Sequence, residues 1–191
     1  GCSPARDVPP PAPEGHTLAV REVRALMHTP RLEPRGIPRG AFGPLLGSLS
    51  SVTMPTRTTD PAWLRQGDQS LAVSALQLPD ARGRDEGSAR VFDVGGDVSV
   101  VMAADDAGVE ELRLLRSVPA RYEARYALQA EGLTFATDGV RVHARDRGGR
   151  RYLVLPKAFA VDAAGVRRDL RATLESASEG GAIVALSLAT D

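Results

Sequence analysis

Cysteine, asparagine and long apolar runs are scarce or absent in this chain, and each absence narrows the class of protein. Cys2 is the only cysteine among the 191 residues, so no disulfide can form within the chain. No run of about 18 or more apolar residues occurs, so the sequence predicts no transmembrane helix. The chain is nevertheless long enough to bury a substantial core, and we expect that core to hold the fold.

Lysine and isoleucine are also rare, and the charges are balanced. Lys157 is the only lysine, and isoleucine occurs only at Ile37 and Ile183. Since lysine, asparagine and isoleucine use AT-rich codons, their scarcity indicates a GC-rich genome and explains the abundance of arginine. The 24 basic side chains balance 24 acidic ones. With no net charge to attract a polyanion, we expect no nucleic-acid partner.

Proline is concentrated near the N-terminus. Proline fixes φ and favours an extended polyproline II path, so a segment rich in it makes a semi-rigid spacer. We therefore expect residues 1–16 to be a tether and residues 17–191 to form a single β-rich domain. The prolines of the tether are Pro4, Pro9, Pro10, Pro11 and Pro13.

The segment 17–67 is expected to be irregular and packed on the β-rich body, with the sandwich itself over 68–191. Six prolines and four glycines interrupt residues 30–61, which is too many for long regular elements. The segment still carries apolar side chains, and Phe42, Leu45 and Leu46 are candidates for contact with a partner. Asp60 and Pro61 predict one short helical turn over 60–64, with Asp60 as its N-cap.

The pattern from residue 68 onward is typical of short strands joined by tight turns. Asp can accept N–H bonds at the start of a turn and Gly can take positive φ at its end. Such turns are expected over 80–83, 93–96, 105–108, 138–139, 146–149, 162–165 and 179–181. Between them, apolar or alternating runs predict strands over 98–102, 112–115, 122–128, 140–145, 152–155 and 183–188. The expected fold is mainly β, an antiparallel β-sandwich, with a partly open β-barrel as the alternative.

The start Gly1-Cys2-Ser3 resembles the end of the lipobox of bacterial lipoproteins, where a small residue precedes the cysteine that receives lipid. The resemblance implies that Cys2 is the lipid-attachment residue. It also implies a location at the cell envelope, in the outer membrane, with the membrane as a partner through the lipid anchor.

A second resemblance covers residues 126–166. It lies in Gly132-Leu133, Asp138-Gly139-Val140, Arg145-Asp146, Gly149, Pro156, Val161-Asp162 and Gly165. This run resembles a β-rich domain of large surface proteins from high-GC Gram-negative soil bacteria, which often carry SBBP-type β-propeller repeats. The resemblance implies an extracellular or periplasmic β-sandwich used as a scaffold or adhesive module, and it brings no catalytic residues.

Motifs for catalysis, nucleotides or metals are missing from the sequence. His16, His28 and His143 lack metal-ligand spacing, and His143 is expected to be solvated on the polar face of a strand. No phosphate-binding glycine loop or G-x-S-x-G elbow occurs. We therefore assign no catalytic, cofactor or metal residue. The hairpin end carrying Arg147, Arg150 and Arg151 is expected to be solvated, with contact to an anionic glycan or an acidic partner as the alternative.

These features predict a non-enzymatic lipoprotein of the cell envelope that acts as a binding, adhesive or structural module. Its partner is expected to be another envelope protein or a glycan. Two alternatives remain open at this point. One is an envelope hydrolase acting on glycan or peptide, and the other is a periplasmic subunit of a secretion or surface complex.

Overall fold

The computed structural model describes residues 49, 51–86, 89–96, 98–105, 108–117, 119 and 121–188, and every regular element within them is a β-strand. The expected mainly β fold is therefore confirmed. The strands are β1 (Ser51–Thr53), β2 (Ala62–Gln66), β3 (Gln69–Leu76), β4 (Gly83–Glu86), β5 (Ala89–Asp93), β6 (Val98–Asp105), β7 (Gly108–Leu115), β8 (Glu123–Gln129), β9 (Thr134–Thr137), β10 (Val142–Arg145), β11 (Arg151–Leu155), β12 (Phe159–Val161), β13 (Arg167–Ser178) and β14 (Gly181–Leu188).

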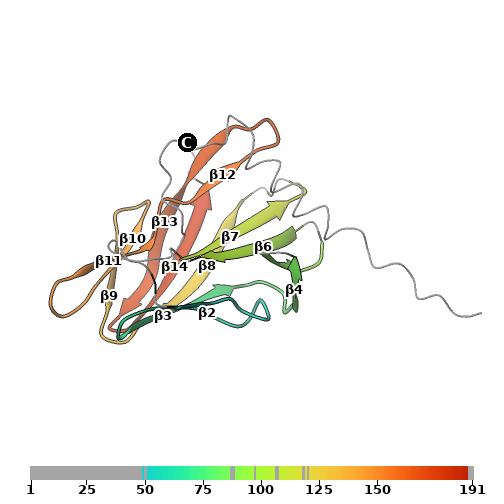
Figure 1. The fold of residues 1–191 in the computed structure, drawn as a ribbon. Coiled ribbons are helices and arrows are strands. Elements are labelled where there is room, and N and C mark those ends of the chain that lie inside the picture. Colours follow the sequence, from blue (N-terminus) through green and yellow to red (C-terminus); the bar gives the residue numbers. More distant parts are fainter. Residues whose placement is uncertain are drawn as a thin grey trace, which may run out of the picture.

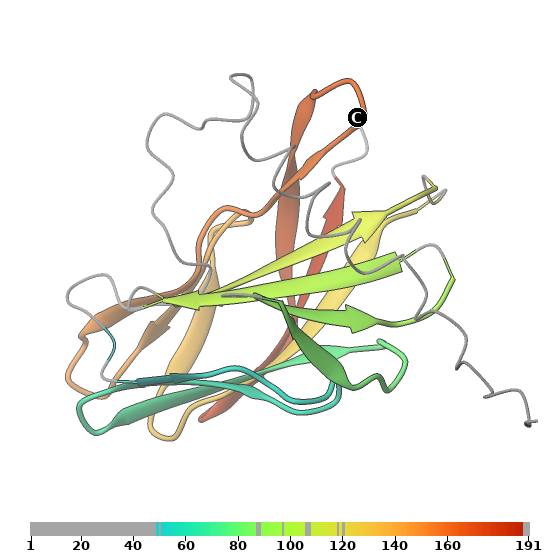
Figure 2. The ribbon, with the colours of Figure 1, turned by 45° about the vertical axis from the view of Figure 1, so that its right-hand side comes forward.

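The strands form three antiparallel sheets. A long, curled sheet has the order β1-β2-β3-β8-β14-β13-β12. Two smaller sheets, β4-β5-β6-β7 and β11-β10-β9, pack on one face of it, which we call the inner face. Strand β9 contacts β13 and β14, whereas β6 contacts β1 and β7 contacts β2 (Figure 1, Figure 2). The result is an antiparallel β-sandwich in which the second layer is divided into two sheets.

The core lies between the inner face and the two smaller sheets. Strand side chains alternate between two faces, so every second residue of the long sheet enters this core. From the long sheet these residues include Ala62, Leu64, Val73, Ala124, Tyr126, Leu128, Val184 and Leu186. Leu133, Phe135, Val142, Ala144 and Val154 meet them from the β9–β11 side, and Val109 meets them from β7. Phe92 and Val100 are fully buried against Met54 and Leu78 in a second cluster.

Several expected turns are confirmed with the expected hydrogen bonds. Asp138 Oδ1 accepts the N–H groups of Val140 (3.0 Å) and Arg141 (2.7 Å), and Gly139 has φ 92°. These two N–H donors hold the pKa of Asp138 below its usual value. Because they serve the turn, β10 begins at Val142 rather than at residue 140, where the expected strand began.

The turn expected over 80–83 is wrong. Both carboxylate oxygens of Asp80 accept hydrogen bonds from Arg57, at 2.8 and 2.6 Å, so Asp80 joins two distant loops. Gly83 is the first residue of β4, and its N–H donates to Thr56 O at 2.8 Å.

The prediction of a helical turn over 60–64 is also wrong. The segment 17–67 was expected to be irregular, but its described end contains the strands β1 and β2. Asp60 Oδ2 accepts the Arg57 N–H (3.0 Å) in a turn that precedes β2. Ala62 and Leu64 then enter the core while Trp63 faces outward. Alternating burial stabilises a strand here, and tertiary packing overrides the local helix-start signal. The tether 1–16 and residues 17–48 lie outside the described part of the chain.

A substitution at Gly83 tests the tight packing of β4 on β5. A Cβ at this position would lie 2.6 Å from Arg90 Cδ and 2.8 Å from Phe92 Cε1. Since Phe92 is fully buried, it has no room to move away. We expect Gly83→Ala to lower the free energy of unfolding in urea by about 1–3 kcal/mol.

The matched control is Gly181→Ala, another strand glycine without positive φ. A Cβ at Gly181 would meet its nearest atom at 3.5 Å, which is ordinary contact. We expect a change below about 1 kcal/mol in this variant. Equal losses in the two variants would contradict the packing described for Gly83.

Candidate functional site

An ion pair is buried between β7 and the long sheet. Val109, Glu111 and Arg113 alternate along β7 and face β8, where Val109 joins the core. The side chains of Glu111 and Arg113 are only 6% and 10% exposed. Charged side chains this deeply buried are costly unless they are paired, so their partners decide whether they serve the fold or a reaction.

The partners of this pair come from both strands. Arg113 Nε donates to Glu111 Oε1 at 2.7 Å, and the Tyr126 hydroxyl donates to the same oxygen at 2.8 Å. The Arg113 guanidinium also lies over the Tyr126 ring, 5.3 Å from its centre. Its Nη2 atom is buried and has no hydrogen-bond partner among the described residues.

The electrostatics of this cluster favour a structural role. Burial raises the pKa of Tyr126, and the Glu111 carboxylate raises it further, so Tyr126 is a hydrogen-bond donor and not a base at neutral pH. Burial alone would lower the pKa of Arg113, but Tyr126 and Glu111 keep it above its usual value. The cluster therefore joins β7 to β8 through fixed charges.

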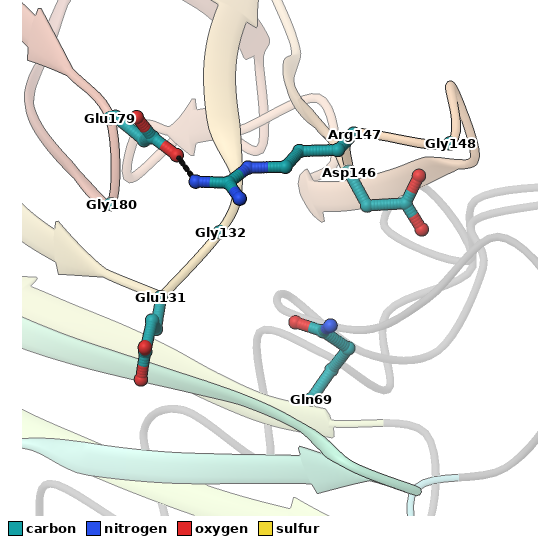
Figure 3. A pocket seen from close by; sticks show the side chains of 8 residues that line it. All are labelled: Gln69, Glu131, Gly132, Asp146, Arg147, Gly148, Glu179 and Gly180. Atoms are coloured by element: carbon teal, nitrogen blue, oxygen red, sulfur yellow. Dashed lines mark hydrogen bonds and ion pairs between the residues drawn. The ribbon is translucent and has the colours of Figure 1, made fainter.

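A polar hollow of about 610 Å³ lies where three connections of the sandwich meet the start of β3. Its lining comes from the start of β3 and from the β8–β9, β10–β11 and β13–β14 connections. Ala130 N–H donates to Gly180 O, and Gly180 N–H donates to Leu133 O, both at 2.9 Å, which fastens two of these connections together. The lining residues are Gln69, Glu131, Gly132, Asp146, Arg147, Gly148, Glu179 and Gly180 (Figure 3).

Two of the three carboxylates in the hollow are already engaged. Figure 3 shows Arg147 reaching toward Glu179, and their Nη2 and Oε1 atoms are 2.6 Å apart. Asp146 accepts the Arg150 N–H (2.9 Å) and the Tyr152 hydroxyl (3.2 Å). The Asp146 bonds hold the β10–β11 hairpin end, whereas Arg147 and Glu179 form an exposed pair between two hairpins.

The three arginines singled out by the sequence have different surroundings. Arg147 lines the hollow, the Arg150 guanidinium lies 5.6 Å from the centre of the Tyr152 ring, and Arg151 is exposed at the start of β11. The structure does not gather them around one position. The other predicted residues, Cys2, Phe42, Leu45 and Leu46, lie outside the described part of the chain.

His143 differs from its expected solvated state. Its side chain is only 15% exposed, its Nε2 lies 3.6 Å from Asp138 Oδ2, and its Nδ1 is buried with no partner among the described residues. It projects from the face of β10 opposite the main core, as the alternation predicted. Neighbouring groups shield its side chain from solvent, and the alternation of residues along a strand does not predict such shielding.

The outer face of the long sheet carries a row of six residues that the sequence did not single out. Residues directly opposite each other in antiparallel strands share a face. Thr53 pairs with Trp63, Trp63 with Ala72, and Ala72 with Gln129. Gln129 pairs with Gly181, and Gly181 with Ser178. We call this line, Thr53–Trp63–Ala72–Gln129–Gly181–Ser178, the Trp63 row.

Trp63 differs from the rest of this row because it is a large hydrophobic side chain that is 39% exposed. Within the described part of the chain, Val166 is the other large hydrophobic residue that is exposed. Ala72 beside it is 2% exposed, while Thr53, Gln129 and Ser178 are exposed. The alternation in Ala62-Trp63-Leu64-Arg65 was the available signal, since it predicts that Trp63 faces away from the buried Ala62 and Leu64. This alternation was not used in the prediction because Asp60 and Pro61 match the start of a helix.

Among the described residues, no three or more His, Cys, Asp or Glu side chains gather in a position to hold a metal ion. In the same part of the chain, no helix has the length and hydropathy needed to cross a membrane.

The fold and its surfaces define an antiparallel β-sandwich with an exposed aromatic residue on its long sheet. A scan against protein-family models, a search of curated proteins and a search of solved structures each found no match. Any inference about function therefore rests on the residues of this chain alone.

Removing one member of the buried ion pair tests its structural role. Glu111→Ala leaves the Arg113 charge buried without its carboxylate, and we expect a loss of about 3–5 kcal/mol in the free energy of unfolding. The double variant Glu111→Leu, Arg113→Met removes both charges and should recover much of that loss. Urea unfolding of the two variants is the measurement. A double variant that is less stable than Glu111→Ala would contradict the assignment.

Proposed function

We propose that this chain is a non-enzymatic binding module of the bacterial cell envelope. Lipid on Cys2 holds it at the outer membrane, the proline-rich segment 1–16 gives it reach, and the outer face of the long sheet makes the contact. Each part rests on a different feature of the chain.

The exposed position of Trp63 carries the proposal. A tryptophan offers the largest apolar surface of any side chain, and exposed aromatic residues are enriched in binding surfaces. Here the side chain is 39% exposed although the adjacent residues Ala62 and Leu64 are buried in the core. A fold that needed Trp63 only for stability would gain more from it on the inner face, so its outward position favours a role in contact.

The hollow and the buried ion pair support a binding role over catalysis. Asp146 accepts hydrogen bonds within its own hairpin, and the buried Glu111 is held by Arg113 and Tyr126. A carboxylate committed to such partners is poorly placed to exchange protons with a substrate. These two acidic groups are therefore better explained as structural.

The anchor is supported by the lipobox-like start Gly1-Cys2-Ser3 and by the five prolines that follow it. A multiply acylated cysteine holds a protein firmly on a membrane, and an extended spacer keeps the folded body clear of it. The resemblance of residues 126–166 to domains of bacterial surface proteins agrees with that location.

The anchor predicts a lipid on protein taken from the bacterium that makes it. Mass spectrometry of the N-terminal peptide should show Cys2 as its first residue, with a diacylglyceryl group on the sulfur and an acyl group on the α-amine, and the wild-type protein should lie in the membrane fraction. Cys2→Ser should have the unmodified mass and appear in the soluble fraction. Wild-type protein with an unmodified Cys2, or in the soluble fraction, would remove the anchor from the proposal.

The contact surface predicts binding that does not need the lipid. Full-length Cys2→Ser protein, mixed with isolated envelopes of the same bacterium, should sediment with them. Adding Trp63→Ala should weaken the binding by about tenfold or more, the effect expected of an aromatic hot spot. Adding Val166→Ala, which removes the other large hydrophobic side chain exposed among the described residues, should change little. Equal binding by the Trp63→Ala and Val166→Ala proteins would show that the contact surface lies elsewhere.

A further inference from the structure

We propose that the ligand of the Trp63 row is a neutral glycan, bound by stacking of a sugar ring on the Trp63 indole. This inference rests on the proposed function, because it names the chemical class recognised by the same surface. Four properties of the row lead to it: its register, its composition, its charge and its extent.

The register places the polar groups beside the indole in a defined order. Thr53 of β1 lies directly across from Trp63 on one side, and Ala72 of β3 lies across from it on the other. Gln129 of β8 follows Ala72. The backbone ladder fixes these positions, so the row does not depend on a loop for its shape.

The composition fits the two-sided chemistry of a sugar ring. A pyranose presents a face of C–H groups, which packs on an aromatic ring, and a rim of hydroxyl groups that need hydrogen-bond partners. Trp63 supplies the aromatic face. The side chains of Thr53, Gln129 and Ser178 supply hydroxyl and amide groups that both donate and accept. Ala72 and Gly181 separate them with small residues, so no bulky side chain of the row stands between these groups.

The charge of the row favours an uncharged ligand, and beside the row on the same face Arg65 of β2 is a single cation two residues from Trp63. None of the six residues of the row is ionisable. Farther along β8, Arg125 Nε donates to Glu175 Oε2 at 2.9 Å, so that arginine is neutralised by its partner. A polyanionic glycan requires unpaired cations lined up along its path, and the row does not provide them.

The limited apolar area favours a glycan over a protein partner. A stable protein interface buries roughly 800 Å² on each side around a core of several aromatic or aliphatic side chains. In the row, Trp63 is the only large apolar side chain. Its neighbours along β2 and β3 on the same face, Arg65, Ser70 and Ser74, are polar.

The extent of the row matches a short oligosaccharide. Neighbouring strands lie about 4.8 Å apart, so Trp63 and Gln129, which are separated by two strand spacings, are roughly 10 Å apart. That span is on the scale of a disaccharide. A chain lying across the strands would stack one ring on Trp63 and place the next near Gln129.

Trp63 is the only tryptophan of the chain, so its own fluorescence reports on the site. Full-length Cys2→Ser protein would be titrated with cellohexaose, chitohexaose, laminarihexaose and mannohexaose, and with heparin as a polyanion. We expect at least one neutral oligosaccharide to shift the emission to shorter wavelength and to saturate, with no change from heparin. If none of the four neutral probes changes the emission, or if heparin alone does, the inference is overturned.

Variants in the same background assign the binding to the row by calorimetry, which does not need the tryptophan. Trp63→Ala should weaken the affinity for the oligosaccharide at least tenfold, and Trp63→Tyr should retain most of it because a flat ring remains. Gln129→Ala should weaken it several-fold, and Val166→Ala should leave it unchanged. Thermal melting of each variant checks that the fold is intact. Unchanged affinity in Trp63→Ala would overturn the inference.

Treated envelopes separate a failure of this inference from a failure of the proposed function. Periodate cleaves vicinal diols of sugars, and protease removes envelope proteins. Binding of the Cys2→Ser protein that depends on Trp63, survives protease and is lost after periodate supports a glycan. Binding that depends on Trp63 but is lost after protease would identify a protein partner, which overturns the inference and leaves the proposed function standing. Binding that does not depend on Trp63 overturns both.

Discussion

The two-residue period of the antiparallel strand is the constraint on which the rest of the structure depends. Each strand of the long sheet must place one set of side chains in the core, so the remaining set is committed to the outer face. Ala62 and Leu64 are buried, and Trp63 between them is therefore displayed. The same pairing that closes the core also lines up Thr53, Ala72 and Gln129 beside it. One strand register therefore determines both which residues form the core and which form the contact surface.

The division of the second layer explains where the charges lie. The sheet β9–β11 meets the long sheet through apolar side chains, whereas β7 brings Glu111 and Arg113 against Tyr126. A charged pair with a third polar partner has fewer favourable arrangements than an apolar contact, so it specifies how β7 lies on β8. At the hairpin ends, the exposed Arg147–Glu179 pair is open to solvent and contributes little to stability.

Much of the fold could be predicted from the sequence, because short strands and Asp-Gly turns leave local patterns. The turns at Asp138 and Asp162 and the strands near 98–105 and 181–188 follow directly from such patterns. The failures occurred where distant residues decide the outcome. Asp80 binds Arg57 from another loop, β2 replaces the expected helical turn because its alternate residues enter the core, and His143 is covered by its neighbours. The candidate surface was missed for the same reason, since its row combines six strands.

The register shift between Leu174 and Ser176 in β13 changes which face of the sheet the following residues occupy. Before it, Leu170 and Ala172 point into the core; after it, Ser176 and Ser178, which have the same parity, lie on the outer face opposite Ile183 and Gly181. The extra residue, Glu175, meets Arg125 on that outer face. After a bulge of this kind, every later residue in the strand faces the side of the sheet opposite to the one that unbroken alternation would give it. The hydroxyl end of the Trp63 row thus depends on the bulge. If Glu175 were instead paired in regular register, Ala177 would lie opposite Gly181, and Ser176 and Ser178 would turn toward the inner face.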